Sequence, residues 1–239
     1  MSSVKELIDE LPKRITSGET VWFRGQHDAS WRLLPTIFRH PYAPFSSSKE
    51  TEAGKRFRQN ALPNLTGDRP HTEAEWIFLM RHHGVPTRLL DWTESPLIGL
   101  YFAVSNPAHD GDDAALWAIH PYELNQEAGV DIIPGFDDDI ELENYLPSRA
   151  AKGATSSPLA AIGVRNSPRM YAQKGMFTIS HRDGIPLENV GAKKHIWRYV
   201  IPKNKKPQIR EQLKIVRVDR LAIFPDLDSV AEVATEAFE

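Results

Sequence analysis

The chain has 239 residues, of which 41% are hydrophobic, and its formal net charge is -3. This length suits one domain with a sizeable core, and the charge lacks the basic excess by which proteins hold duplex nucleic acid, although a local basic groove stays open. The absence of cysteine excludes disulfides, thiolate metal sites and a cysteine nucleophile, and it fits a cytoplasmic location. No apolar run approaches the roughly 20 residues that span a bilayer, so we expect a soluble protein with no membrane partner.

The N-terminal segment is expected to form a helix followed by a strand. Apolar residues at helical spacing follow a cap at Ser2 or Ser3, and Gly18 is expected to end this helix. Pro12 predicts a kink or break within it, because proline removes a backbone donor. Residues 20–26 alternate between two faces, which predicts a strand.

Arg24 is the candidate site residue on that strand. Val21, Phe23 and Gly25 lie on one face and Trp22 and Arg24 on the other, because successive side chains of a strand alternate. The alternative interpretation is a surface arginine stacked on tryptophan. We favour a binding role because the glycine that follows would let a ligand approach the backbone.

Two helices are expected in the middle of the chain before residue 85. Residues 49–62 have the pattern of a solvent-facing helix. Thr72 and Glu75 form a capping box that opens the next helix, and Gly84 ends it.

A helix of a different kind is expected between Thr93 and Ser105. Ser95 can cap it, Pro96 suits its first turn, and residues 97–103 leave no polar face. We therefore expect this helix to be buried on all sides.

The remaining pattern favours strands that are not separated by regular crossover helices. Residues 168–174 predict a short helical turn, and residues 213–218 fit either a strand or the end of a helix. The fold class is therefore predicted as α+β, a single domain with a mostly antiparallel central sheet and packed helices. Strands are expected at residues 115–120, 159–164, 176–180, 196–201 and 221–224.

Three motifs follow one another along the chain. Residues 81–95 place two histidines, two arginines, an aspartate and a tryptophan beside an uncharged segment. The sequence Phe-Arg-Gly-Gln at residues 23–26 lies upstream, and residues 173–178 lie downstream. Together these motifs resemble those of the FRG domain family, named after Phe-Arg-Gly. The resemblance extends from about Val21 to about Leu227, and it implies one FRG domain over residues 1–239 with its core at 20–227.

Arg88 and Asp91 lie between the helix that opens at Thr72 and the helix capped by Ser95, and two histidines end the former helix. Arg88 and Asp91 are three apart, so one interpretation is an ion pair that pins a loop, and the other is that Arg88 contacts phosphate while Asp91 orients a partner. His82 and His83 point about 100° apart on a helix and cannot share one metal, so no metal site is expected and His83 is placed at the site.

The start of the helix capped by Ser95 is a second candidate for binding. Its backbone N–H groups favour an anion, and the hydroxyls of Thr93 and Ser95 add donors. Trp92 is either a packing anchor or a surface for a ligand ring. No glycine-rich phosphate loop occurs, which removes support for ATP-hydrolase and dehydrogenase functions.

The order of these parts is similar to that of ADP-ribosyltransferases, in which an early strand holds NAD and a polar segment leads into a buried helix. The first two places match. At the third place, ADP-ribosyltransferases carry a carboxylate on a late strand, whereas this chain has Gln173. Loss of such a charge costs on the order of 3 kcal/mol of transition-state stabilisation. Asp91 and Glu94 are the local alternatives for an acid. The resemblance implies catalytic roles for Arg24, Thr93 and Gln173, and cofactor contacts for Gly25, Gln26, His83, Arg88, Asp91, Trp92, Ser95 and Arg169.

Two functions stay open from the sequence. One is an NAD-dependent ADP-ribosyltransferase, acting as a bacterial toxin or phage-defence effector on an unknown protein or nucleic-acid acceptor, with Trp92 or Tyr171 stacked on nicotinamide. The other is a non-catalytic module that binds a nucleotide or a nucleic-acid end through several arginines. Those arginines are Arg24, Arg88, Arg165 and Arg169.

Overall fold

A computed structural model describes residues 1–65, 69–135, 140–150, 156–163, 168–235 and 238. Its centre is a six-stranded sheet in the order β4-β5-β2-β1-β3-β6. Every neighbouring pair is antiparallel, so the predicted α+β class with an antiparallel sheet is confirmed. The strands are β1 Trp22–Gln26, β2 Leu89–Thr93, β3 Ala114–Ile119, β4 Leu159–Ala161, β5 Gly175–Ile179 and β6 Ile196–Ile201.

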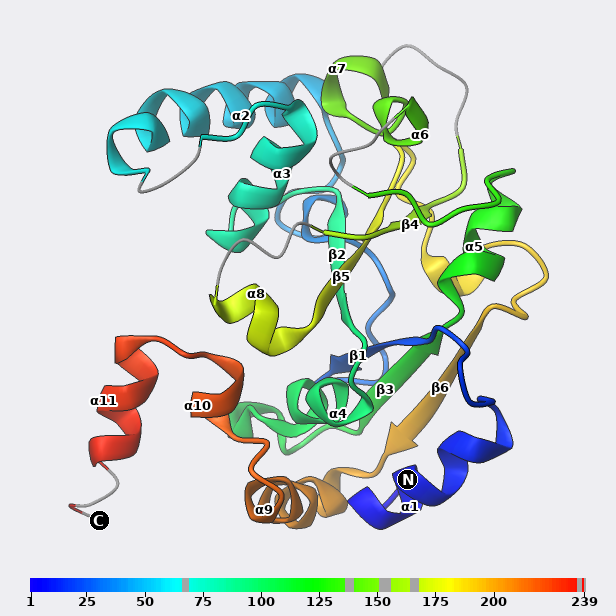
Figure 1. Cartoon of the computed structure of the whole chain (residues 1–239), viewed down its shortest axis with the longest axis vertical. Helices are drawn as coiled ribbons and strands as arrows, with labels where there is room; N and C mark the ends of the chain where they lie inside the picture. The colour runs from blue at the N-terminus through cyan, green and yellow to red at the C-terminus, as the bar shows by residue number, and fades with distance from the viewer. Residues whose placement is uncertain (66–68, 136–139, 151–155, 164–167, 236–237, 239) are drawn as a thin grey trace.

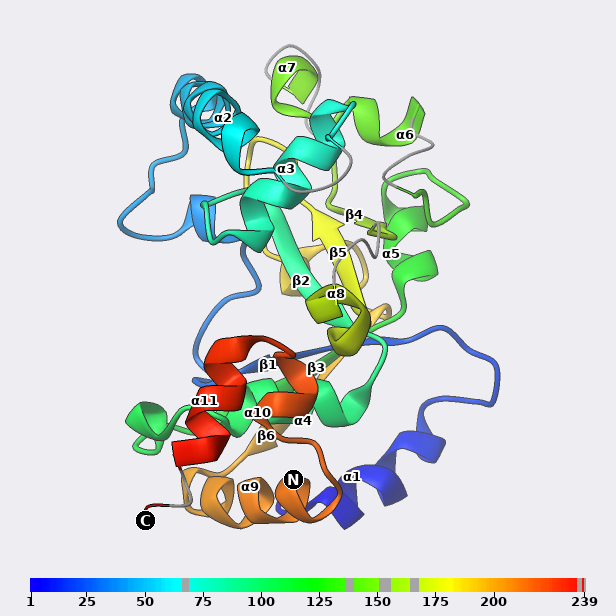
Figure 2. The same ribbon diagram turned by 60° about the vertical axis from the view of Figure 1, so that its left-hand side comes forward.

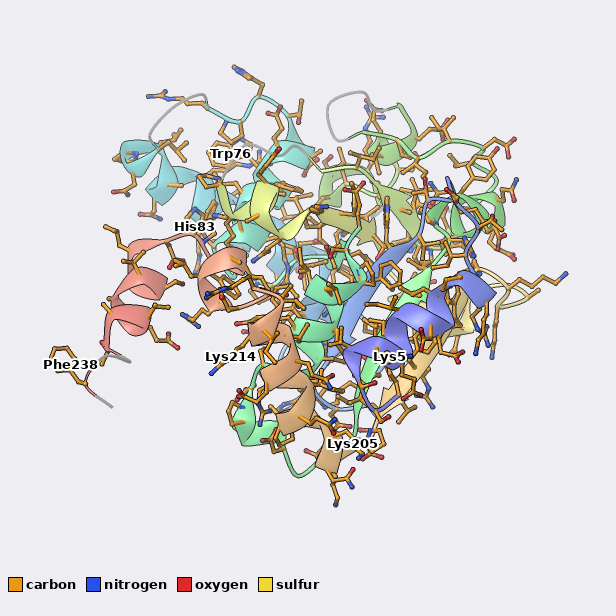
Figure 3. The ribbon with its side chains drawn as sticks, turned by 60° about the horizontal axis from the view of Figure 1, so that its bottom comes forward. Lys5, Trp76, His83, Lys205, Lys214 and Phe238 are labelled. Carbon is orange, nitrogen blue, oxygen red and sulfur yellow. The ribbon has the colours of Figure 1, made fainter. Side chains whose placement is uncertain are left out.

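Helices cover the sheet in groups that follow its two halves (Figures 1 and 2). The α-helices are α1 Val4–Glu10, α2 Ser47–Ala61, α3 Glu73–His82, α4 Pro96–Val104, α5 Pro121–Glu127, α6 Ile140–Glu143, α7 Pro147–Ala150, α8 Pro168–Gln173, α9 Lys206–Ile215, α10 Arg220–Ile223 and α11 Leu227–Thr235. Figure 3 shows α1, marked by Lys5, beside α9, marked by Lys214, and Val4 N–H donates to the Gln212 side chain across this contact. Short 3-10 helices span Leu11–Lys13, Thr36–Phe38, Leu62–Asn64, Pro107–His109, Leu187–Asn189 and Lys203–Lys205. Among the described residues, no helix is long and apolar enough to cross a membrane.

The first cluster of the core lies where α4 packs on β1. A Cβ atom added to Gly25 would lie 2.2 Å from the Gly99 carbonyl oxygen and 2.3 Å from the Ala103 nitrogen. This glycine therefore lets a helix approach the strand, while the expected approach of a ligand at Gly25 stays a prediction. Buried around this contact are Val4, Leu7, Val21, Phe23, Leu100, Ala103, Val104, Ala114, Leu116, Ala118, Ile201, Ile209 and Leu213.

The two central strands separate after a single pair. β1 pairs with β3 along its whole length, and β2 does the same with β5, but β1 and β2 are in register only at Phe23 and Thr93. Beyond that pair, the Arg24 side chain bridges the gap, because its Nη1 donates to the Asp91 carbonyl oxygen at 2.7 Å. The sheet therefore consists of two well-paired halves that open away from each other at its centre.

Strand β2 was not expected, since the sequence pattern assigned it to a connection between two helices. Its burial pattern shows that only Asp91 is partly exposed among residues 89–93. The short apolar stretch is flanked and interrupted by charge, which hid its strand character. The predicted pair of Arg88 with Asp91 is also wrong, because residues three apart on an extended chain point to opposite faces.

Arg88 instead forms a buried ion pair with a distant helix. Its Nε donates to Glu50 Oε1 at 2.8 Å and its Nη2 contacts the other carboxylate oxygen. Its Nη1 donates to the Tyr145 carbonyl at 2.7 Å and reaches the Ser180 carbonyl at 3.4 Å. Helix α2 is therefore not wholly solvent-facing, because Glu50 lies inside the protein.

Two local predictions of the N-terminal half are confirmed. The capping box has both of its hydrogen bonds, from Glu75 N–H to the Thr72 side chain and from Thr72 N–H to the Glu75 side chain. Ser95 caps α4 by accepting from Ile98 N–H. A third prediction needs correction, since α4 is not buried on all sides and Phe102 is only half-buried.

Three chain segments differ from or refine the expected elements. The first helix breaks into a 3-10 turn that contains Pro12, as expected, but it ends well before Gly18. Residues 221–223 belong to helix α10 rather than a strand, and Phe224 is its C-cap; the Asp219 side chain caps the start of this helix by accepting from Ala222 N–H. In the ambiguous segment 213–218, residues 213–215 are the end of helix α9, and the chain leaves the helix at Val216.

Candidate functional site

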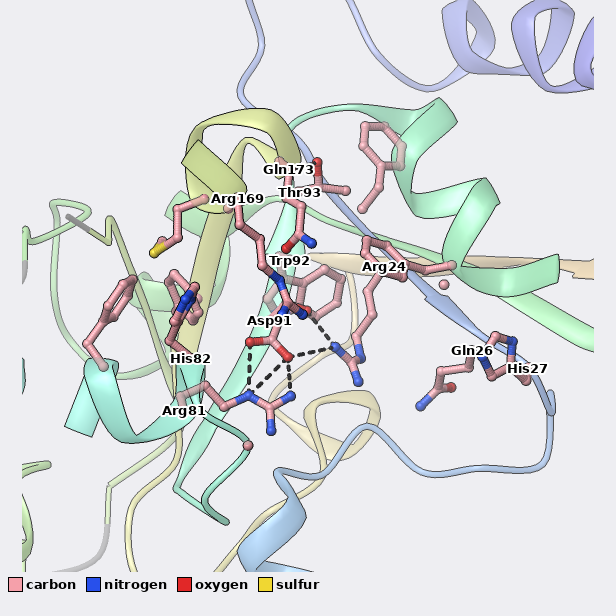
Figure 4. A pocket seen from close by; sticks show the side chains of 18 of the residues that line it. Arg24, Gln26, His27, Arg81, His82, Asp91, Trp92, Thr93, Arg169 and Gln173 are labelled. Atoms are coloured by element: carbon pink, nitrogen blue, oxygen red, sulfur yellow. Dashed lines mark hydrogen bonds and ion pairs between the residues drawn. The ribbon is translucent and has the colours of Figure 1, made fainter. Parts of the chain in front are cut away.

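A cavity of about 690 Å³ lies at the opening between β1 and β2 (Figure 4). Its walls come from these strands, β5, the end of α3, and α8. Aromatic side chains line much of it, namely Phe23, Trp31, Phe78, Trp92, Phe102 and Phe177. The splayed strands thus produce both the space and its boundaries.

Charge in this cavity is strongly one-sided. Four arginines line it, from β1, the loop after the 3-10 turn 36–38, α3 and α8, and Asp91 is the one acidic residue in the described lining. With the histidines neutral, these groups sum to about three positive charges. Such a surface favours an anion. The arginines are Arg24, Arg39, Arg81 and Arg169.

Asp91 links two of the arginines at the centre of the site (Figure 4). Arg81 Nε donates to both carboxylate oxygens, at 3.0 and 3.1 Å, and its Nη2 contacts Oδ2. Arg24 Nη1 lies 3.8 Å from Oδ2. Burial raises the pKa of Asp91, but the charge and hydrogen bonds of Arg81, followed by the charge of Arg24, leave it below its ordinary value. The carboxylate is therefore ionised at neutral pH.

Arg24 and Arg39 each keep a buried donor unsatisfied. Burial lowers the Arg24 pKa to about 10 despite the attraction of Asp91, so the guanidinium remains charged at neutral pH. Its Nε has no hydrogen-bond partner among the described residues, and neither has Arg39 Nη2. Arg39 Nε is held by the Leu34 carbonyl at 2.7 Å. Buried donors without partners are costly, so a ligand that accepts from them would be stabilised.

The wall formed by α8 is held by the C-terminal helices. The guanidinium carbon of Arg169 lies 4.8 Å from the ring centre of Phe224, a cation–π contact. Gln173 Nε2 donates to the Ile223 carbonyl at 3.4 Å. The Thr93 hydroxyl donates to the Gln173 carbonyl at 2.7 Å. Thr93 and Gln173 therefore have structural partners as well as a place at the cavity.

Gln26 and Trp92 line the cavity with their polar atoms already bonded. Gln26 Oε1 accepts from Trp117 Nε1 at 2.8 Å, and Trp92 Nε1 donates to the Thr178 hydroxyl at 3.1 Å. Both residues are buried. They present surface to a ligand but have few unused hydrogen-bonding groups.

The structure brings nine of the eleven candidate residues to this one cavity, while their roles in binding or catalysis stay predictions. Arg88 does not line the cavity, because its guanidinium is fully buried against Glu50. Ser95 does not line it either, and its hydroxyl caps α4. The nine are Arg24, Gly25, Gln26, His83, Asp91, Trp92, Thr93, Arg169 and Gln173.

Both histidines at the end of α3 line the cavity, whereas only one was expected there. The rings of His82 and His83 meet edge to face, with centres 5.1 Å apart. Burial, with the neighbouring ring and Arg169, lowers the pKa of His82. No group of three or more metal-binding side chains occurs in the described part of the chain.

Two other residues, Tyr171 and Arg165, were also named from the sequence. Tyr171 is 73% exposed and is not part of the cavity wall. Arg165 lies outside the described residues.

Sequence reasoning missed Arg39 and Arg81. Arg81 opens the motif-bearing segment, so its position next to the two histidines was the available signal. Arg39 belongs to a segment without regular periodicity, and nothing local pointed to it.

These features define an α+β domain whose antiparallel sheet opens at its centre around a cationic cavity. Residues 19–112 match the FRG domain family, and the chain therefore carries an FRG domain. The match includes β1, α3, β2 and α4, which supply most of the cavity. The extension of the family to residue 227, and the single domain over 1–239, stay predictions. Comparisons with curated proteins and with solved structures find no significant match.

Proposed function

We propose that this FRG domain binds a nucleotide-type anion, with NAD as the expected ligand and substrate. The observation that carries the proposal is the set of four arginines against one aspartate around the cavity. Arg24 and Arg39 also have buried donors that a phosphate oxygen would satisfy. A volume of about 690 Å³ lies within the usual range for small-molecule sites, which is roughly 300–1,000 Å³.

ADP-ribosyl transfer is the catalytic form of this proposal. The bond between nicotinamide and the ribose C1′ atom breaks, nicotinamide leaves with the bonding electrons, and a nucleophile of the acceptor forms the new bond to C1′. In this form Arg24 and its neighbours hold the phosphates, and the domain acts as a bacterial toxin or phage-defence effector.

The charge of Asp91 favours a second candidate, non-catalytic nucleotide binding. Its carboxylate is bound by Arg81 and faces Arg24, so little negative charge remains to stabilise a cationic sugar. Gln173, which the resemblance to ADP-ribosyltransferases aligns with their carboxylate, is neutral, and its amide donates to the Ile223 carbonyl. A module that holds a nucleotide without cleaving it fits these contacts.

Calorimetric titration with NAD, ADP-ribose and inorganic pyrophosphate tests the binding proposal. Arg24→Lys should weaken NAD binding at least about tenfold, because an ammonium cannot reproduce the two-point contact of a guanidinium with phosphate. The melting temperature should change little, since the lysine keeps the positive charge near Asp91. The matched control is Arg56→Lys, an exposed arginine of α2 paired with Glu52, which should bind as wild type.

Nicotinamide release then separates the two candidate functions. Release by the wild-type protein, lost in Arg24→Lys, supports the transferase. Binding without release supports the non-catalytic module. Wild-type protein that binds none of the three ligands would refute the proposed function.

A further inference from the structure

We propose that His27, Trp31 and His109 form a subsite for a nucleobase at one end of the cavity. The inference rests on the proposed function, because it places the base of the same nucleotide whose phosphates lie on the arginines. It names Trp31 as the residue that contacts the base.

The three rings form a compact cluster. His27 and His109 are stacked, with ring centres 5.4 Å apart and planes 9° apart. Trp31 stands nearly perpendicular to both, with ring centres at 6.4 Å from His27 and 5.3 Å from His109. His27 and Trp31 line the cavity, and 37% of Trp31 is exposed. An indole is thus supported by the imidazoles while part of its surface stays accessible.

A buried lysine fixes the backbone beneath this cluster. Lys206 Nζ donates to the carbonyls of His27 and His109, at 2.7 and 2.6 Å. Its side chain joins the loop after β1 to the 3-10 turn 107–109. A preorganised ring cluster loses little conformational freedom when a ligand binds, which favours affinity.

The chemistry of the cluster favours a neutral planar ring rather than another phosphate. His27 Nδ1 lies 3.3 Å from the Ala103 carbonyl, and since a carbonyl can only accept, Nδ1 carries the proton and Nε2 is the acceptor of the neutral ring. Burial lowers the pKa of His27, and the charge of Lys206 contributes to the same shift. The neutral imidazole of His27 and the indole of Trp31 therefore differ in kind from the guanidiniums.

The subsite lies next to the proposed phosphate site, because His27 follows directly after strand β1, which carries Arg24. Arg24 and His27 are three residues apart at the end of the strand, and both line the cavity. Figure 4 shows His27 on the far side of Gln26 from the contact of Arg24 with Asp91. A nucleotide has a charged phosphate at one end and an aromatic base at the other, joined by a sugar. The cavity likewise has arginines in one part and aromatic rings in another.

The test compares ADP, which has a base, with inorganic pyrophosphate, which has none. Trp31→Ala should weaken ADP binding roughly fivefold to a hundredfold, the range for loss of one base–aromatic stack. Pyrophosphate binding should stay within about twofold of wild type. Trp31→Phe should keep most of the ADP affinity, and Tyr122→Ala, an exposed aromatic of α5, is the control.

Tryptophan fluorescence provides a measurement that does not depend on the alanine variant folding. ADP should quench a part of the wild-type emission that is missing in Trp31→Phe, while pyrophosphate should not. Equal weakening of both ligands by Trp31→Ala, or unchanged ADP binding, would overturn the subsite. If wild-type protein binds neither ligand, the proposed function fails and the subsite fails with it.

Discussion

At the scale of single residues, the main feature of the site is that Arg81 and Arg24 share Asp91 as an acceptor for their guanidinium donors. Arg81 makes three contacts with Asp91, whereas Arg24 donates to the backbone of the same residue and its Nε has no partner in the part of the chain that the structure describes. Asp91 therefore orders two arginines without satisfying both. An anionic ligand would add acceptors where the protein lacks them, which is the physical basis of the binding proposal.

The ionisation of Asp91 leads to a prediction about pH. Its pKa is lowered in the folded protein, so its contribution to stability is present above the unfolded value of about 3.9 and is lost as the pH falls through the lower folded value. Asp91→Asn should be less stable than wild type at pH 7. This difference should narrow below about pH 4, as measured by urea unfolding at both pH values.

The control for this prediction is Asp131→Asn, which removes an exposed carboxylate outside the cavity. It should leave the free energy of unfolding close to that of wild type at pH 7. A stability difference for Asp91→Asn that is the same at pH 7 and pH 3 would show that the charge of Asp91 does not contribute.

At the scale of elements, alternate residues of β1 have different roles: some pack against helix α4, and the others face the cavity or the opposite side of the sheet. Phe23 and Gly25 meet α4, while Trp22 packs on the other side of the sheet and Arg24 reaches toward Asp91. The Phe-Arg-Gly motif thus combines a core residue, a cation at the cavity and a position where a helix approaches. This alternation explains why three consecutive residues have three different physical roles.

The variant Gly25→Ala tests the close packing of β1 on α4. The added Cβ would lie within 2.3 Å of two backbone atoms of α4, and backbone cannot move aside as a side chain can. We expect a loss in the free energy of unfolding at the upper end of the roughly 1–3 kcal/mol that overpacking costs, or above it. Gly111→Ala is the matched control, because no atom of the described residues lies within 4 Å of its added Cβ. Equal melting temperatures for the two variants would contradict the packing of β1 on α4.

At the scale of the whole molecule, buried charges join distant parts of the chain. The pair of Glu50 and Arg88 links α2 to the start of β2, and Arg88 also binds the carbonyls of Tyr145 and Ser180. One guanidinium therefore connects four segments of the protein. Removal of its carboxylate partner would leave a buried charge without compensation.

Glu50→Ala should therefore cost about 3–5 kcal/mol in the free energy of unfolding. Glu52→Ala, which removes an exposed carboxylate from the same helix, should cost less than about 1 kcal/mol. The double variant Glu50→Leu/Arg88→Met should recover part of the loss, because no buried charge remains. Urea unfolding of the three variants measures these differences. Similar stability of Glu50→Ala and Glu52→Ala would mean that the buried pair does not hold the fold together.

The sequence by itself determined the features of this protein that depend on neighbours along the chain. The capping box at Thr72, the Ser95 cap and the alternation along β1 were predictable, because hydrogen bonds and periodicity over a few residues specify them. Only the tertiary structure decided which partner each charge takes, since Glu50 and Arg88 are 38 residues apart. It also decided that β1 and β2 separate after one pair. That opening brings arginines from four segments to one cavity, and no local pattern contains it.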